Sequence, residues 1–323
     1  MKVCPATEAE TCVKTIIDDC PSTMEILSVI DSCDGETTRL QAAKSKLKTL
    51  LRQNHGSTKN AEVMQAIEEL CALNPTKDAV TSPLLLGEFL AHTSPDFPGR
   101  IKNNNGNPNT PPVPDDVVQY TMGRLSFGIF QPHHLVCTIR HVRNSILECS
   151  EEHQVDGQKT FSYPIQIDLT IHTPKGDLTA SMCHEALCYV LPDHANRLGV
   201  TFRGGTLTPA FAVRSDPKLM KVWEEVFDHA YSKAEAERSF MSSVMQFLLK
   251  KMLDLSTPTD ASVGNSATKS AKFEMGRSPR GYLDILYLDE EMRITRGNRG
   301  TFIVVERVQT KGQRVFPKRV PLN

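Results

Sequence analysis

The chain has 323 residues, of which 39% are hydrophobic and 23% charged, so it has the composition of a globular protein with one large domain or two ordinary ones. Its formal net charge of −1 argues against general nucleic-acid binding, which needs a basic surface. No apolar run approaches the ~20 residues that span a bilayer, so the protein is not expected to be transmembrane.

Charged residues and cysteines give two further constraints. Lys and Arg outnumber Asp and Glu between Arg277 and Asn323, so the C-terminal part is basic. The nine cysteines are an odd number in a long chain, which favours a reduced compartment over a disulfide framework. Acidic residues precede Arg39, the first arginine, so the N-terminus lacks the Arg-rich, acid-poor character of a transit peptide.

Three helices are predicted before the first strand. Ser22-Thr23-Met24-Glu25 has the form of a capping box and leads into an apolar run. Gln41–Gln53 carries apolar residues at helical spacing, and Asn60 stands where it would cap a further helix. Leu73-Asn74-Pro75 ends this part, because proline cannot continue a helix.

From Leu84 onward, short β-type runs separated by turn residues predict an antiparallel sandwich or barrel. Residues 84–94 read as the first strand. The following runs are Val117–Phe130, Leu135–Leu147, Phe161–Thr173, Leu178–Cys183, Ala186–Leu191 and Arg197–Phe202. Turns are predicted at Asp156-Gly157, Pro174-Lys175-Gly176 and Gly204-Gly205.

The last part of the chain combines helices with a closing meander. Apolar residues at three- and four-residue steps predict helices at 219–230 and 240–252, followed by the polar segment Ser256–Ser270. Three β-type runs then follow, namely Tyr282–Leu288, Met292–Thr295 and Thr301–Arg307. The acidic turn Asp289-Glu290-Glu291 and a turn containing Gly and Asn separate them, and together they predict an antiparallel meander that shuts a barrel.

Four stretches of this sequence resemble one known family. YLDEEMRITRGNRG followed by an apolar strand resembles the C-terminal signature of the plastid lipid-associated proteins, also called the PAP/fibrillin family. AIEELCALNPTKDAVTSPLLLGEF is similar to that family's entry segment, RLSFGIFQPHHLVCTIRHVRN to its central strand pair, and RLGVTFRGGTLTP to its Gly-Gly strand end. The likeness covers residues 41–307 in pieces. Residues 1–38 and the helical insertion fit it poorly, and Phe89 stands where relatives usually carry Trp.

The resemblance implies a mainly β (α+β) fold, a calycin/lipocalin-like antiparallel barrel with N-terminal helices and a helical insertion. The expected division is an N-terminal helical extension at 1–38, a PAP/fibrillin-like domain at 39–310 and a basic tail at 311–323. Within the domain we expect helices at 40–74, barrel strands at 84–205 and 281–308, a helical insertion at 217–255 and a polar linker at 256–270.

A barrel of this kind leaves room for one hydrophobic ligand among its inward side chains. By resemblance, the protein binds or carries an apolar small molecule (an isoprenoid, quinone, carotenoid or acyl lipid), or coats plastid lipid particles such as plastoglobules or thylakoid surfaces. The candidate interior residues are Phe89, Phe127, Ile129, Ile139, Ile167, Phe202, Ile285 and Phe302. Taken singly, each is alternatively an ordinary core residue.

The sequence offers no positive case for an enzyme, a cofactor or a metal. No G-x-S-x-G nucleophile motif and no phosphate loop is present. Cys183 and Cys188 form one loosely spaced pair around His184, whereas a structural zinc site needs four ligands. Glu290 and Glu291 are interpreted as solvated turn residues. The alternative from another class is an enzyme that acts on a hydrophobic lipid inside the barrel.

Two segments allow either a lipid contact or an ordinary role. The helix predicted in Ala236–Leu255 has an apolar stripe beside Lys250 and Lys251, which suits docking on its own domain or lying in a lipid interface. The basic tail Lys311–Arg319 either touches anionic lipid or only solubilises the chain. The family resemblance implies a plastid (chloroplast) location.

A specific contact is expected where the barrel closes. In calycin folds an aromatic residue on the first strand commonly packs under an arginine from the last one, and Phe89 and Arg307 occupy those places. We therefore expect Leu85–Thr93 and Thr301–Arg307 to be neighbouring strands, with Arg307 in contact with Phe89. On this basis Phe89→Ala should destabilise the protein several times more than Arg307→Lys.

Overall fold

The computed structural model describes residues 23–101, 113–114, 116–128, 132–149, 154–155, 157–238, 269–275 and 281–309. Its helices are α2 (Thr23–Gln53), α3 (Ala61–Cys71), the 3₁₀ turn η1 (Pro83–Leu85), α4 (Met122–Leu125), α5 (Phe211–Arg214) and α6 (Pro217–Arg238). Its strands are β1 (Phe89–Ala91), β2 (Val118–Thr121), β3 (Val136–Asn144), β4 (Leu147–Glu148), β5 (Thr160–Ser162), β6 (Ile165–Thr173), β7 (Gly176–Val190), β8 (Arg197–Pro209), β9 (Ala271–Glu274), β10 (Gly281–Leu288), β11 (Met292–Gly297) and β12 (Phe302–Arg307).

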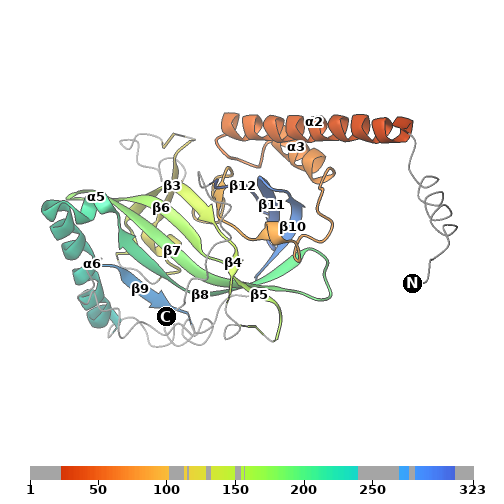
Figure 1. Ribbon diagram of the computed structural model, residues 1–323. Coiled ribbons are helices and arrows are strands. Elements are labelled where there is room, and N and C mark those ends of the chain that lie inside the picture. The colour runs from red at the N-terminus through yellow and green to blue at the C-terminus, as the bar shows by residue number, and fades with distance from the viewer. Residues whose placement is uncertain are drawn as a thin grey trace, which may run out of the picture.

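Eight antiparallel strands close into a barrel. Going around it, β7 pairs with β6, then follow β3, β1, β12, β11, β10 and β8, and β8 pairs again with β7. Four strands lie outside this ring: β2 pairs with β3, β5 with β7 and β9 with β8, while β4 pairs with β5. The mainly β antiparallel barrel predicted from the sequence is therefore confirmed, and the three closing runs form β10, β11 and β12 as predicted (Figure 1).

The first and last strands meet where closure was predicted. Phe89 of β1 lies opposite Arg307 of β12, and Ala91 lies opposite Val305. The Arg307 guanidinium carbon lies 4.6 Å from the centre of the Phe89 ring. Both the expected strand pairing and the expected contact between Arg307 and Phe89 are confirmed.

Several predicted boundaries differ from the structure. The first strand covers only Phe89–Ala91 of the predicted 84–94, because Pro83–Leu85 form a 3₁₀ turn. Strand β7 continues through His184-Glu185, where a break between two strands was predicted, because its inward side chains keep alternating from Leu178 to Cys188. Strand β8 runs through Gly204-Gly205, which therefore form no turn; a bulge in the β7–β8 pairing absorbs the extra residue. The run Val117–Phe130 ends as a strand at Thr121, whose hydroxyl oxygen accepts from the Arg124 N–H and caps α4.

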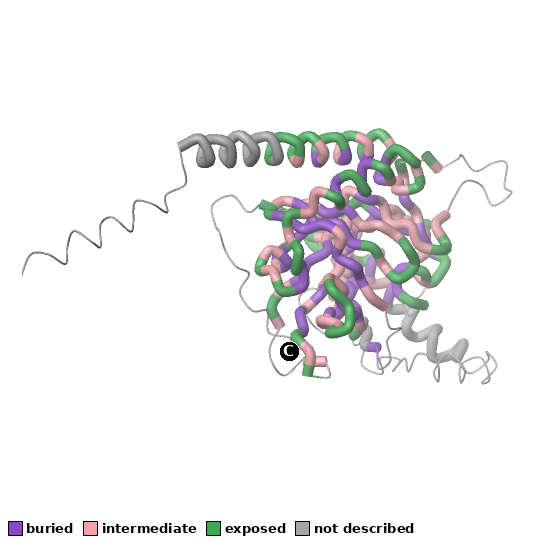
Figure 2. The backbone as a smooth tube through the Cα atoms, turned by 90° about the vertical axis from the view of Figure 1, so that its right-hand side faces the viewer, coloured by how far each residue is buried: buried purple, intermediate pink, exposed green. Residues whose placement is uncertain are grey.

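Helices α2 and α3 cover the outside of the closing meander. Apolar residues of the two helices pack with outward residues of β10, β11 and β12, namely Leu47, Leu51, Val63, Ala66, Ile67, Leu70, Tyr287, Met292, Ile294 and Val304. Asn60 caps α3 as predicted, because its side-chain oxygen accepts from the Glu62 and Val63 N–H groups. Helix α2 is one continuous helix where two were predicted, and the rest of its described surface is largely exposed (Figure 2).

The turn between β10 and β11 is not the solvated acidic turn that the sequence suggested. Asp289 is only 8% exposed, and its carboxylate accepts from the Lys44 ammonium of α2 at 2.7 Å. Its other oxygen accepts from the Glu291 and Met292 N–H groups, while the Glu291 side chain is itself paired with Lys44. Glu290 is exposed as predicted, whereas the Glu291 side chain, 41% exposed, is in addition paired with Lys44 of α2.

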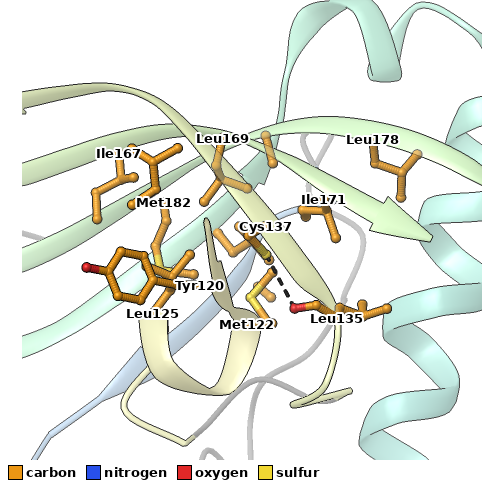
Figure 3. Close-up of a cluster of buried hydrophobic side chains, with 14 of the residues drawn as sticks. Tyr120, Met122, Leu125, Leu135, Cys137, Ile167, Leu169, Ile171, Leu178 and Met182 are labelled. Carbon is orange, nitrogen blue, oxygen red and sulfur yellow. Dashed lines mark hydrogen bonds between the residues drawn. The ribbon is translucent and has the colours of Figure 1, made fainter. Parts of the chain in front are cut away.

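One end of the barrel interior is filled by a large apolar cluster. Side chains from β2, α4, β3, β6 and β7 converge there, as Figure 3 shows for Met122, Cys137 and Ile171 among others. Trp223 and Phe227 of α6 belong to the same cluster, with ring centres 4.5 Å apart, and the Trp223 N–H donates to the Lys269 carbonyl. This end is packed core.

Gly87 shows why the chain needs glycine just before β1. Its φ is +148°, and a Cβ at this position would overlap Nη1 of Arg307 and lie 3.5 Å from the Phe89 ring. We expect Gly87→Ala to destabilise the protein by about 1–3 kcal/mol, because the backbone would be strained and Arg307 displaced. Urea unfolding measures this. Gly281→Ala is the control, since its Cβ would meet nothing within 4 Å; equal effects of the two changes would contradict the expectation.

Candidate functional site

The strand registers define which side chains share the inner face of the barrel. Residues directly opposite each other in an antiparallel pair lie on the same face, and the face alternates along each strand. Starting from Phe89 and following each pairing around the ring gives one inner set. Its members include Phe89, Ala91, Val142, Asn144, Ile165, Ile167, Met182, His184, Ala186, Cys188, Leu198, Val200, Phe202, Leu283, Ile285, Arg293, Thr295, Ile303, Val305 and Arg307.

Part of the inner face is apolar and yet not fully covered. Several of its apolar side chains are only partly buried; we call five of them, Ala91, Val142, Ile165, Phe202 and Ile303, the apolar lane. Four of them come from the neighbouring strands β6, β3, β1 and β12, and Phe202 comes from β8. Residues at such positions are normally core. Val142, Ile165 and Phe202 also pack against the large apolar cluster under α6.

A polar group on the inner face links Arg293 of β11 to Asn144 of β3 and to Tyr163 between β5 and β6. Arg293 is 1% exposed, and its Nη2 donates to the Asn144 side-chain oxygen at 2.7 Å and to the Asn144 carbonyl at 3.2 Å. The Asn144 amide nitrogen in turn donates to the Tyr163 hydroxyl oxygen at 2.7 Å. The Arg293 guanidinium carbon also lies 4.3 Å from the centre of the Phe89 ring. Phe89 is thus in contact with two arginines, Arg293 and Arg307.

Burial perturbs the ionisable groups here. Burial lowers the pKa of Arg293 to about 10, so the guanidinium stays protonated at neutral pH. Burial likewise raises the pKa of the Tyr163 hydroxyl and raises that of the Cys188 thiol to about 12. Both therefore stay neutral, and neither is activated as a base or nucleophile.

An aromatic group lies over the interior near α4. Phe127 has a φ of +53°, which is unusual for a bulky residue, and it is 37% exposed. Its ring centre lies 5.5 Å from that of Phe202 and 5.3 Å from that of His184. The His184 Nε2 is paired with the Leu125 carbonyl at 2.8 Å, and burial lowers the pKa of this imidazole. The segment after β2 is therefore attached to the inner face of β7.

The predicted interior residues fall into separate groups. Phe127 and Phe202 are brought together, whereas Ile139 and Ile167 lie in the packed cluster below α6. Ile285 belongs to a second apolar cluster with Leu85, Leu198 and Leu288, and Phe89 lies between the two arginines. Phe302 packs against the cluster under α2 and α3, on the outer face. Ile129 lies outside the described residues.

The polar inner residues were missed by the sequence reading. In the run Met292–Thr295 the apolar residues suggest the inward side, but Met292 and Ile294 face α2 and α3, which leaves Arg293 and Thr295 inward. The sequence of the strand does not show whether its apolar or its polar residues face the barrel interior. A period of two gives alternation, but it does not say which side the helices cover. Asn144 and Tyr163 gave no signal either.

The two clefts found among the described residues lie elsewhere. One of about 420 Å³ is lined mainly by polar side chains, including His55, Lys59 and Arg100, and a second of about 370 Å³ adjoins it. Within the described part of the chain, no three His, Cys, Asp or Glu residues are grouped so that they could hold a metal ion. Over the same residues, no helix is long and apolar enough to cross a membrane. The segment Ala236–Leu255 lies outside the described residues from 239 onward.

Comparison with known proteins gives one match. The PAP_fibrillin family model matches residues 193–306, a span that begins just before β8 and ends in β12. This match confirms the predicted resemblance for that part of the chain; the similar stretches before residue 193 stay a prediction. No curated protein and no solved structure matched the chain.

Proposed function

We propose, from the PAP_fibrillin match over residues 193–306, that this chain is a plastid lipid-associated protein that holds an apolar small molecule inside a calycin-like barrel and catalyses no reaction. The observation that carries the proposal is the apolar lane. A closed barrel of eight strands is just wide enough for its side chains or for one small ligand. Side chains that stay partly exposed on its inner face favour the ligand.

The energetics suit a ligand that is mostly hydrocarbon. Burying each methylene of an acyl or prenyl chain contributes about 0.8 kcal/mol, so a chain of moderate length binds measurably without polar recognition. An isoprenoid, quinone, carotenoid or acyl lipid meets this condition. The alternative role as an enzyme finds little support on the inner face, because the Cys188 and Tyr163 groups are held neutral by burial.

A matched pair of adjacent residues tests the binding site. Ile303 and Phe302 are both partly buried on β12, but Ile303 belongs to the lane whereas Phe302 packs under the helices. We expect Ile303→Asn to weaken binding of a prenyl quinone about tenfold, since a polar group would face the hydrocarbon. Phe302→Asn should leave the affinity unchanged. Quenching of Trp223, the single tryptophan, by the quinone measures the affinity.

The outcomes separate binding from coating. Equal affinities of the two variants would place the ligand outside the lane and contradict the proposal. A protein that only coats particles would float with lipid droplets of plastid composition, and Ile303→Asn would not change its flotation. Lipids retained on purification from the source organism, identified by mass spectrometry, give the natural ligand. A fluorescent fusion of the full-length protein tests the plastid location.

A further inference from the structure

We propose that Arg293 and Tyr163 form a site for the carboxylate of a long-chain acid whose hydrocarbon tail lies along the apolar lane. This inference rests on the proposed function and names the ligand class more closely: an amphiphile with a terminal acid, in place of a purely apolar molecule. It is carried by the unused hydrogen-bond donors of the two side chains and by their position beside the lane.

The first step is that Arg293 is buried with most of its donors unused. Nε and Nη1 have no hydrogen-bond partner, and only Nη2 donates, to Asn144. Among the described residues no carboxylate forms an ion pair with this guanidinium, which also lies over the ring of Phe89 and near the like charge of Arg307. A charge taken out of water without an opposite charge is strongly disfavoured unless something compensates it. An anion from outside the chain would supply that compensation.

The second step is that the Tyr163 hydroxyl beside Arg293 also has a hydrogen without an acceptor among the described residues. The Tyr163 hydroxyl oxygen accepts from the Asn144 amide, which leaves its own hydrogen for another acceptor. The Asn144 side chain bonds both of them: its oxygen accepts from Arg293 and its amide nitrogen donates to Tyr163. The unused groups of Arg293 and Tyr163 are thus N–H and O–H donors. A deprotonated carboxylate, which only accepts hydrogen bonds, is complementary to it.

The third step is the position of the site relative to the lane. Val305 lies opposite Arg293 in the β11–β12 pairing and opposite Ala91 in the β1–β12 pairing. Ile303 is the next inner residue along β12 and lies opposite Thr295. Ala91 and Ile303 belong to the lane, so a chain whose carboxylate reaches Arg293 has its first methylenes beside these two residues. Phe89 and Arg307 close the barrel behind Arg293.

The test compares a fluorescent polyene fatty acid with its methyl ester, which has the same chain and no charge. The wild-type protein should bind the acid at least about tenfold more tightly than the ester near pH 8, because one charge-assisted hydrogen bond raises the affinity by about that factor. Arg293→Met should bring this ratio close to one while leaving the affinity for the ester unchanged. Arg293→Lys should keep part of the preference, and Tyr163→Phe should lower it a few-fold.

The outcomes distinguish this proposal from the one on which it rests. If neither acid nor ester binds the wild-type protein, the proposed function fails. If both bind and the acid-to-ester ratio is the same in Arg293→Met and in the wild type, only the carboxylate site fails. A prenyl phosphate that binds more tightly than the fatty acid, with the same loss in Arg293→Met, would overturn the choice of a carboxylate. Circular dichroism and thermal unfolding of each variant verify its fold, and Arg293→Lys keeps the test usable if Arg293→Met does not fold.

Discussion

Phe89→Ala is expected to lower the free energy of unfolding by about 3–5 kcal/mol, the range for removing a fully buried aromatic side chain. Phe89 is 0% exposed, and its ring contacts the guanidinium groups of both Arg293 and Arg307. The change therefore leaves a cavity where β1 meets β12 and removes two cation–π contacts. Urea unfolding followed by circular dichroism measures the loss.

The matched control is Phe211→Ala, because Phe211 is 77% exposed and its removal should change stability by less than about 0.5 kcal/mol. Arg307→Lys gives a second comparison. Arg307 donates to the carbonyls of Leu84, Leu86 and Glu290, a fork that lysine cannot reproduce. We therefore expect it to cost about 1–3 kcal/mol, closer to Phe89→Ala than the sequence alone suggested. A loss below 1 kcal/mol for Phe89→Ala would contradict its role in closing the barrel.

Lys44→Met is expected to destabilise the protein by about 3–5 kcal/mol, since it leaves the Asp289 carboxylate buried without its cation. The Lys44 side chain is 4% exposed and that of Asp289 10%. Asp289 also accepts a hydrogen bond from the Tyr287 hydroxyl. The matched control on the same helix is Lys46→Met, because the Lys46–Glu69 pair is exposed on both sides and its loss should have no measurable effect.

The effect of Lys44→Met should depend on pH in a defined direction. Burial alone raises the pKa of Asp289, but the hydrogen bonds from Lys44, Tyr287 and the turn backbone outweigh it, so the pKa is lowered. A lowered folded-state pKa stabilises above the unfolded value of about 3.9, and this stabilisation is lost as the pH falls through the folded value. The difference between wild type and Lys44→Met should therefore shrink below about pH 4. If the difference in stability between wild type and Lys44→Met were undiminished about one pH unit below that point, at roughly pH 2.5 to 3, the assignment to Asp289 would be contradicted.

Local patterns in the sequence determined several elements of this protein. Alternation and turn residues gave β10, β11 and β12, and Asn60 gave the start of α3. The expected closure gave the pairing of Phe89 with Arg307. These features could be predicted because each depends on neighbouring residues or on the single requirement that a closed sheet has no free edge.

Only the tertiary structure decided which face of each strand is covered, and by what. Lys44 and Asp289 are 245 positions apart, and Arg293 and Asn144 are 149 apart, so no local pattern links them. Helices α2 and α3 bury Met292 and Ile294 on the outside of β11, and alternation then turns Arg293 into the barrel. A strand with both faces buried has no solvent side to reveal its orientation. The candidate carboxylate site follows from this packing, because two helices near the start of the sequence cover a strand near its end.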